Sequence, residues 1–331
     1  MPNPSPHESA LALGFPALDP VMSLLSIAHI FGSTKNRCGI YLLCFQSGLF
    51  YVGQSVEVVR RFSQHRRNHD DIVGFSFIPV KTTELDTAEK TLIYRAESLG
   101  LTITNAFHAT TISGDTDLDF VVSASEQETW LRDPSNFYKG QHRASKIVLS
   151  ESQQVRFAKH FAEFEKHPLA PSVLALIQHY VRQCVPAARQ TEYSFWSVSC
   201  MPGTNQATWP RLLSVNAGVM ELFVAGWVKQ QPEKLWSFIT VAEDVLLQHW
   251  NSVKALVENY PFVEVVRRGY RDAGQHQVTF HVQGSDSMAD LLADDGVAKA
   301  AGMLALRVMR KRATIYSKFH CPQLANLALG K

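Results

Sequence analysis

The feature that most constrains the fold is a pair of short apolar segments, residues 38–46 (CGIYLLCFQ) and 49–54 (LFYVGQ). Both are rich in aromatic and aliphatic residues, and the Ser47-Gly48 pair between them is a turn signal, so they predict a β-hairpin. Ser55 then follows as a candidate N-cap for a helix. On that helix Arg61 and His65 are four residues apart and therefore share one face, while Val58 and Phe62 can face the core.

A third strand and a second helix are predicted next. Residues 74–80 (GFSFIPV) form a short apolar run, and Thr83 with Asp86 resembles a capping box. The following apolar positions recur at helical spacing up to Gly100: Leu85, Ala88, Leu92, Ala96 and Leu99. Glu89 lies beside this stripe without a cation three or four residues away, which favours a role in tertiary structure or chemistry.

The polar groups of this region suggest phosphate chemistry. Tyr41 and Tyr51 supply phenols, Arg61 supplies a guanidinium that can hold a phosphate in fork geometry, and His65 titrates near neutral pH. Glu89 adds the carboxylate that a divalent cation needs. Each group alone is more often structural, because strand tyrosines usually pack in the core and helical arginines are usually solvated.

Together these residues resemble the GIY-YIG nucleases over residues 37–108. Gly39-Ile40-Tyr41 matches the first signature tripeptide, and Tyr51-Val52-Gly53 matches the second in a common variant. Arg61, His65 and Glu89 occur at the spacing that the family uses, and Asn105 stands where the family has its closing asparagine. The resemblance implies a β-β-α-β-α domain with a small antiparallel sheet flanked by helices.

The resemblance also implies an activity, metal-dependent hydrolysis of phosphodiester bonds in nucleic acid, with DNA favoured. Glu89 would hold Mg²⁺ or Mn²⁺, and Tyr51 would act as general base with help from His65 or nearby cations. Tyr41 would orient the water or the phosphate. Arg61 would stabilise charge on the phosphate, with Arg60 as a competitor for this role. Asn105 would tie the helix end to the site, and Arg66 and Arg67 would touch phosphates further along.

The chain of 331 residues is longer than one core usually organises, so more than one domain is expected. We predict an arm and short helix over 1–35, the nuclease-like domain over 36–108, a largely helical connector over 109–188, and a C-terminal α+β domain over 189–331. Residues 1–20 are expected to be loose and residues 21–31 helical. In the C-terminal domain we predict three strands, a helix over 233–259, a hairpin, and a last helix over 286–316.

Two basic clusters of the C-terminal domain are candidates for nucleic-acid contact. They consist of Arg267, Arg268 and Arg271 on the hairpin, and Arg307, Arg310, Lys311 and Arg312 on the last helix. Cations among aromatic residues can follow a phosphate backbone, but cations also suit a solvated helix end. Because the formal net charge is only +2, any nucleic-acid surface must be a local patch.

Two further interpretations of function remain open at this point. The chain could be a restriction, defence or toxin-type nuclease directed by its C-terminal domain, or a nuclease-like module that binds nucleic acid without cleaving it. Five widely spaced cysteines without a CxxC pair fit a reducing cytoplasm, and no apolar stretch is long enough to predict a membrane span. A homodimer is expected if both strands of a duplex are cut.

Overall fold

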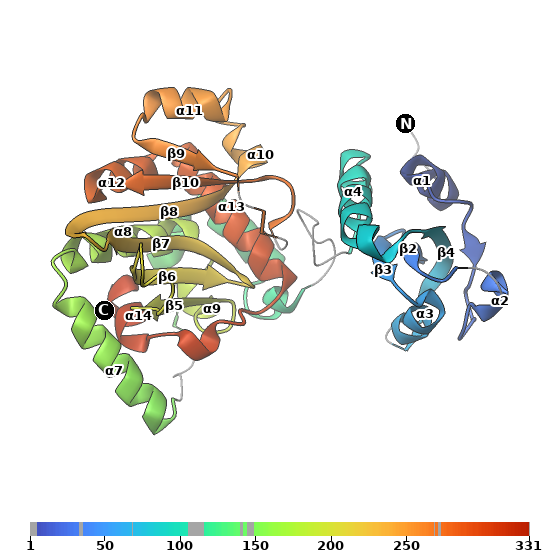
Figure 1. Cartoon of the computed structure of the whole chain (residues 1–331), viewed down its shortest axis with the longest axis horizontal. Coiled ribbons are helices and arrows are strands. Elements are labelled where there is room, and N and C mark those ends of the chain that lie inside the picture. The colour runs from blue at the N-terminus through green and yellow to red at the C-terminus, as the bar shows by residue number, and fades with distance from the viewer. Residues whose placement is uncertain are drawn as a thin grey trace. The chain divides into compact units, whose positions relative to one another are not determined.

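The computed structural model describes residues 5–32, 36–67, 69–104, 116–139, 142–143, 149–267, 269–270 and 273–330. The chain divides into two compact units, Met1–Gly114 and Asp115–Lys331, whose elements are labelled in Figure 1. Four segments were predicted from the sequence, whereas the structure has two units. The arm expected over residues 1–35 belongs to the first unit, and nearly all of the connector expected over 109–188 belongs to the second.

The first unit is built on a four-stranded antiparallel sheet in the order β1-β4-β2-β3. Its strands are β1 (Asp19–Pro20), β2 (Gly39–Phe45), β3 (Phe50–Ser55) and β4 (Ile72–Pro79). The predicted hairpin is present as β2 and β3, with Tyr41 opposite Gly53, and the predicted third strand is present as β4. Every residue of β2 is buried, as expected for a central strand.

Two helices cover opposite faces of this sheet, as Figure 1 shows for the first unit. Helix α3 (Val58–Arg66) packs Val58 and Phe62 on the face that carries Tyr41, and α4 (Leu85–Ser98) packs Leu85 and Ile93 on the other. Both predicted caps differ from the structure. The Ser55 hydroxyl accepts a hydrogen bond from the Glu57 amide, but the residue directly before α3 is Glu57 and not Ser55. Thr83 lies within the 3₁₀ turn η1 (Thr82–Glu84), which precedes α4.

The N-terminal segment is more ordered than the sequence indicated. Helix α1 (Pro6–Leu13) begins with a capping box between Ser5 and Glu8, and it buries Ala10 and Leu13 against the α4 side of the sheet. Strand β1 follows, and only Ala28–Phe31 (α2) is helical within residues 21–31. The expectation of a loose arm over 1–20 is therefore wrong for residues 5–20, because this segment completes the apolar core.

Arg66 fixes the end of α3 from inside the protein. Its side chain is buried, with 7% of the residue exposed. The guanidinium donates to five backbone carbonyls, those of Val21, Leu24, His69, Asp70 and Ile72, at 2.7–3.4 Å. Arg66 was expected to contact nucleic-acid phosphates, but its donors are committed to the fold.

Replacing Arg66 should therefore destabilise the first unit. Arg66→Met keeps the buried aliphatic stem but leaves five carbonyls without a charged donor, and we expect a loss of roughly 3 kcal/mol or more. Urea unfolding followed by amide exchange in β2 measures this loss. Arg67→Met, at the exposed neighbouring position, is the matched control and should cost little. Equal effects of the two changes would contradict the structural role of Arg66.

The second unit is also α+β, with six antiparallel strands in the order β5-β6-β7-β8-β10-β9. The strands are β5 (Trp196–Cys200), β6 (Arg211–Ala217), β7 (Met220–Val228), β8 (Gln231–Ala242), β9 (Val263–Val266) and β10 (Gln277–Gln283). The three strands and the hairpin predicted from the sequence are present. The helix predicted over 233–259 is wrong, because its first part is strand β8.

The core of the second unit lies between one face of this sheet and helices α8 (Ala170–Cys184), α12 (Ser285–Ala293) and α13 (Asp295–Lys311). Figure 1 shows α8 and α13 behind the strands. The predicted last helix is divided into α12 and α13 at Asp294, whose side chain accepts from the Val297 amide and caps α13.

The remaining helical elements are η2 (Asp117–Phe120), α5 (Ala124–Arg132), α6 (Pro134–Lys139), α7 (Glu151–Glu165), α9 (Ala188–Thr191), α10 (Glu243–Leu246), α11 (Val253–Asn259), η4 (Ser317–Phe319) and α14 (Pro322–Ala328). Within the described ranges, each helix is too short or too polar to cross a membrane.

Candidate active site

The β2–β3 hairpin brings two tyrosines together on one face of the first sheet. Tyr41 lies opposite Gly53, and Tyr51 is two residues before Gly53, so both side chains point to the same side. The ring centroids of Tyr41 and Tyr51 are 6.0 Å apart. A Cβ at position 53 would lie 2.5 Å from the Tyr41 phenol and 2.7 Å from the Tyr51 ring. Glycine is therefore required where the two rings cross the strand.

Helix α3 adds Arg61 and His65 to the same face. The Tyr41 hydroxyl lies 2.8 Å from His65 Nε2, and Arg61 Nε donates to the same hydroxyl at 3.3 Å. The Tyr51 and His65 ring centroids are 5.0 Å apart. Arg60 is exposed, so Arg61 is the arginine that reaches the tyrosines, as the register of the sequence indicated. The structure thus brings four of the sequence-predicted residues together.

The protonation states within this cluster follow from burial and nearby charge. Burial raises the pKa of Tyr41 far above its usual range, with the neighbouring Tyr51 adding to the shift. Burial, with Arg61 and His69 nearby, lowers the pKa of His65 to about 4. The hydrogen bond to Tyr41 raises the pKa of Arg61. At neutral pH the cluster therefore holds one cation, Arg61, beside a neutral phenol and a neutral imidazole.

The direction of the hydrogen bonds follows from these states. Arg61 can only donate, so the Tyr41 oxygen accepts from Arg61, and its own hydrogen is available to His65 Nε2. The neutral His65 then carries its proton on Nδ1. Arg61 also donates from Nη1 to Gln64 Oε1 at 3.2 Å. Both hydrogen-bond partners of Arg61 are neutral, so its charge remains available to an anion.

Glu89 lies on the opposite face of the sheet. It belongs to α4 and is buried, with 8% of the residue exposed. Gln54, next to Gly53 on β3, points to the α4 side and donates from Nε2 to Glu89 at 3.1 Å and to Asp86 at 2.6 Å. Gly53 and Gln54 therefore connect the two sets of residues, with the tyrosines on one face and two carboxylates on the other.

The two carboxylates suit a hard divalent cation by their chemistry. Asp86 and Glu89 accept from the same amide nitrogen, so a positive group between them is stabilised. Mg²⁺ is commonly held by one or two carboxylates together with water and substrate phosphate. Among the described residues, no group of three or more His, Cys, Asp and Glu side chains forms a closed metal site.

Asn105, Arg268 and Arg271 lie outside the described residues. The other basic candidates of the second unit are mostly paired with acidic groups. Arg307 makes two 2.7 Å hydrogen bonds to Asp244, and Arg310 contacts Asp119 at 3.1 Å. Arg267 binds Glu243 at 2.7 and 2.8 Å.

The prediction of a basic surface patch on the last helix is therefore wrong. Lys311 is buried, Arg312 is half-buried, and Arg307 and Arg310 are neutralised by carboxylates. These side chains hold α13 to α10 and η2 and do not form a cationic surface. Their ion pairs join residues that are distant along the chain, and for that reason the sequence showed only the cations.

Sequence reasoning did not identify Gln54, Asp86 and His69 as members of the site. Gln54 follows the predicted Tyr-Val-Gly strand, so strand alternation alone places it on the face away from Tyr41. Asp86 is three residues before Glu89, on the same side of a helix. His69 lies near His65, with ring centroids 6.4 Å apart. The first two could have been found from periodicity.

Comparisons of the chain with protein-family models, with curated proteins and with solved structures found no match.

The neutral state of His65 predicts a pH dependence. Its pKa in the folded protein, about 4, lies below the usual 6.5, so the unfolded chain binds a proton at higher pH than the folded chain does. The contribution of His65 to stability should be complete above pH 6.5 and should be lost as the pH falls from 6.5 towards 4. NMR titration of His65 and amide exchange in β2 measure the two effects. His65→Gln should reduce the slope of the unfolding free energy against pH in this range. A measured His65 pKa at or above 6.5 would contradict the conclusion that His65 is neutral in the folded protein.

Proposed function

We propose that the first unit is a GIY-YIG-type endonuclease that hydrolyses phosphodiester bonds in nucleic acid, with DNA as the favoured substrate. The observation that carries the proposal is the convergence of Tyr41, Tyr51, Arg61 and His65 on one face of the sheet. A fully buried phenol bonded to both an arginine and a histidine is unusual for a core tyrosine. It is well suited to holding a phosphate-binding cation in a fixed position.

The four side chains can divide the reaction among them. Arg61 is exposed and has neutral partners, so it can bind the scissile phosphate and stabilise charge that develops on it. The Tyr41 oxygen is engaged by Arg61 and His65, so Tyr41 acts as the support of this pair. Tyr51 is only half-buried and lies beside the neutral His65. Tyr51 is therefore the candidate general base, and His65 can take up a proton only at Nε2, in place of the hydrogen bond that it accepts from Tyr41.

Glu89, with Asp86 beside it, is the candidate ligand for Mg²⁺ or Mn²⁺. Because β3 is an edge strand of the sheet, a divalent cation bound there would supply positive charge for a phosphate that lies across this edge, between the Glu89 side and the Arg61 side. The Gln54 amide, which now donates to both carboxylates, holds them in position. Because one such site cuts one strand, cleavage of a duplex requires a homodimer or two successive nicks.

A second candidate function is a nucleic-acid-binding module without turnover. The observation that favours it is the placement of Glu89 on the sheet face opposite Tyr41 and Arg61. A binder needs Arg61 but has no need for a carboxylate. A nicking assay on supercoiled plasmid, circular single-stranded DNA and RNA, with and without Mg²⁺ or Mn²⁺, separates the two functions. Nicking of any of these substrates in a metal-dependent manner supports the nuclease.

Glu89→Gln should abolish cleavage and leave DNA binding near the wild-type level or tighter. The substitution removes an anionic ligand and keeps the shape and hydrogen-bonding capacity of the side chain. The matched control is Glu84→Gln, an exposed carboxylate in η1 just before the same helix. It should cleave as the wild type does. Full activity of Glu89→Gln at ordinary Mg²⁺ concentrations would remove Glu89 from the mechanism.

Tyr51→Phe should lower kcat strongly while the protein keeps its stability. The change removes one hydroxyl from a half-buried ring, and a general base typically contributes about 10²- to 10⁴-fold to the rate. Tyr41→Phe should instead weaken substrate binding and reduce stability, because it breaks the bonds to Arg61 and His65. Steady-state kinetics with thermal unfolding of both variants gives the comparison. A fall of less than a few-fold in kcat for Tyr51→Phe would place the base elsewhere.

A further inference from the structure

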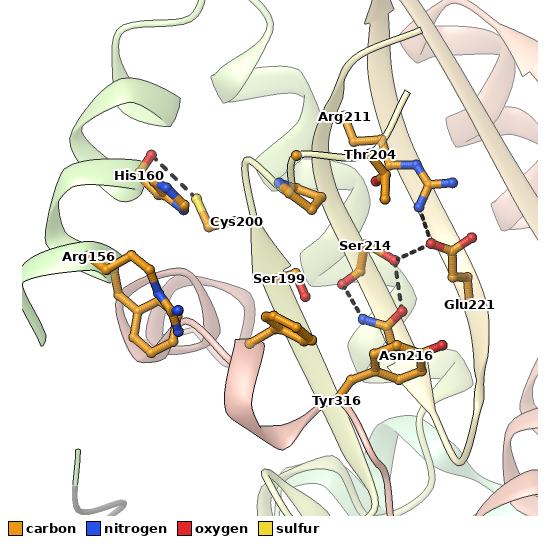
Figure 2. A pocket seen from close by; sticks show the side chains of 14 residues that line it. Arg156, His160, Ser199, Cys200, Thr204, Arg211, Ser214, Asn216, Glu221 and Tyr316 are labelled. Carbon is orange, nitrogen blue, oxygen red and sulfur yellow. Dashed lines mark hydrogen bonds and ion pairs between the residues drawn. The ribbon is translucent and has the colours of Figure 1, made fainter. Parts of the chain in front are cut away.

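A pocket of about 300 Å³ lies in the second unit, on the face of the six-stranded sheet that faces away from the helical core. Strands β5, β6 and β7 form its floor, and α7 and η4 form its walls (Figure 2). Leu213 and Val215 of β6 point into the core, so Ser214 and Asn216 point into the pocket. The volume is at the lower end of the range for ligand pockets, which suits one small ring system.

The floor of the pocket carries a network of polar side chains. Arg211 is 9% exposed and forms an ion pair with Glu221, and the Ser214 hydroxyl lies 2.9 Å from Asn216 Oδ1 and 3.5 Å from Glu221. Asn216 Nδ2 donates to the Ser214 carbonyl at 3.1 Å. Figure 2 shows these four side chains gathered on one side of the pocket.

This network leaves hydrogen-bonding capacity unused. Arg211 Nε is buried and has no partner among the described residues. A buried donor without a partner has a cost of about 1–3 kcal/mol, and this cost falls on the guanidinium beneath the pocket floor. The Glu221 side chain is 22% exposed and keeps acceptor capacity on its second oxygen. The floor thus presents the Ser214 hydroxyl, the Asn216 amide and the Glu221 carboxylate to the pocket.

Aromatic rings and cations complete the pocket. Phe157, Tyr316 and Phe319 line it, and Phe319 is 43% exposed, so its ring is accessible to a ligand. Arg156 lines the pocket, is exposed, and donates to the Lys318 carbonyl at 3.1 Å, while the Lys318 ammonium lies 5.1 Å from the centroid of the Phe319 ring. Figure 2 shows Arg156 on α7, on the side of the pocket away from Glu221.

We propose that this pocket binds the base of one nucleotide, with the phosphate of that nucleotide at Arg156. A nucleobase is planar and stacks on aromatic rings, and its edge carries donors and acceptors side by side, which matches the floor. A purely apolar ligand would leave Asn216 and Glu221 at the floor without partners, and a simple anion would face the carboxylate of Glu221. Where the base belongs to a strand, this inference rests on the proposed action of the first unit on nucleic acid.

Two sources of the nucleotide are possible, a free mononucleotide or a base turned out of a strand. Calorimetry of the full-length chain with each of the four deoxynucleoside monophosphates, without added divalent cation, tests the first source. Fluorescence anisotropy tests the second, by comparing a duplex that has one unpaired base with the same duplex carrying an abasic site there. Tighter binding of the unpaired base indicates that the pocket takes a base from a strand.

The variants are Phe319→Ala and Glu221→Gln, with Phe120→Ala as the control. Phe120 is an aromatic residue of the same unit that is 91% exposed and does not line the pocket. Loss of one stacking ring should weaken binding of the preferred ligand roughly five-fold to more than a hundred-fold. Glu221→Gln should change which base is preferred. Phe319 is at the surface, so this variant remains informative if Glu221→Gln fails to fold.

The result that overturns the proposal is unchanged binding of every mononucleotide and of both duplexes in folded Phe319→Ala and Glu221→Gln, or no binding of any of them by the wild type. Failure of the nuclease proposal looks different. If the chain binds a mononucleotide through this pocket but cuts no nucleic acid with Mg²⁺ or Mn²⁺, the pocket proposal stands and the nuclease proposal fails. If the chain cuts nucleic acid but folded Phe319→Ala and Glu221→Gln bind every ligand as the wild type does, the nuclease proposal stands and the pocket proposal fails.

Discussion

The absence of a side chain at Gly53 is the constraint on which the first unit depends. The rings of Tyr41 and Tyr51 occupy the space that a Cβ would fill, 2.5 Å from the Tyr41 phenol. Because its ring lies across the strand at this point, the Tyr41 hydroxyl reaches both His65 and Arg61 on α3. The other faces of α3 hold the helix in place, through Phe62 in the core and Arg66 among backbone carbonyls. One short helix thus serves the fold and the candidate site.

The electrostatics of the candidate site depend on whether an anion is present. His65 is neutral because it is partly buried and lies near Arg61 and His69. A phosphate bound to Arg61 would oppose the field of the guanidinium, and the pKa of His65 would then rise. In the proposed mechanism His65 is therefore a weak proton acceptor in the empty site and a stronger one when substrate is bound. This coupling would limit proton transfer to the complex with nucleic acid.

Local patterns predicted the elements that depend on local interactions. The hairpin, the third strand and α4 follow from alternation and helical spacing over a few residues, whereas Tyr41, Tyr51, Arg61 and His65 were taken as one site because their joint spacing resembles a nuclease signature. Strand β8 was missed because apolar residues from Trp236 to Leu246 also fit helical spacing, and its pairing with β7 and β10 decided the outcome. Arg66 and Arg307 were misinterpreted because their partners, such as Val21 and Asp244, are 45 and 63 residues away.

Arg61 differs from three arginines of the second unit in the charge of its partners. Arg61 has neutral partners and keeps its charge for an anion, whereas Arg211, Arg307 and Arg310 are each paired with a carboxylate. A protein that follows a phosphate backbone needs unpaired cations, and binding by such contacts is strongly weakened by salt. The paired arginines of the second unit are unsuited to that kind of binding. If the second unit selects the substrate, it must do so mainly by stacking and hydrogen bonding in a pocket, and these interactions can distinguish one base from another.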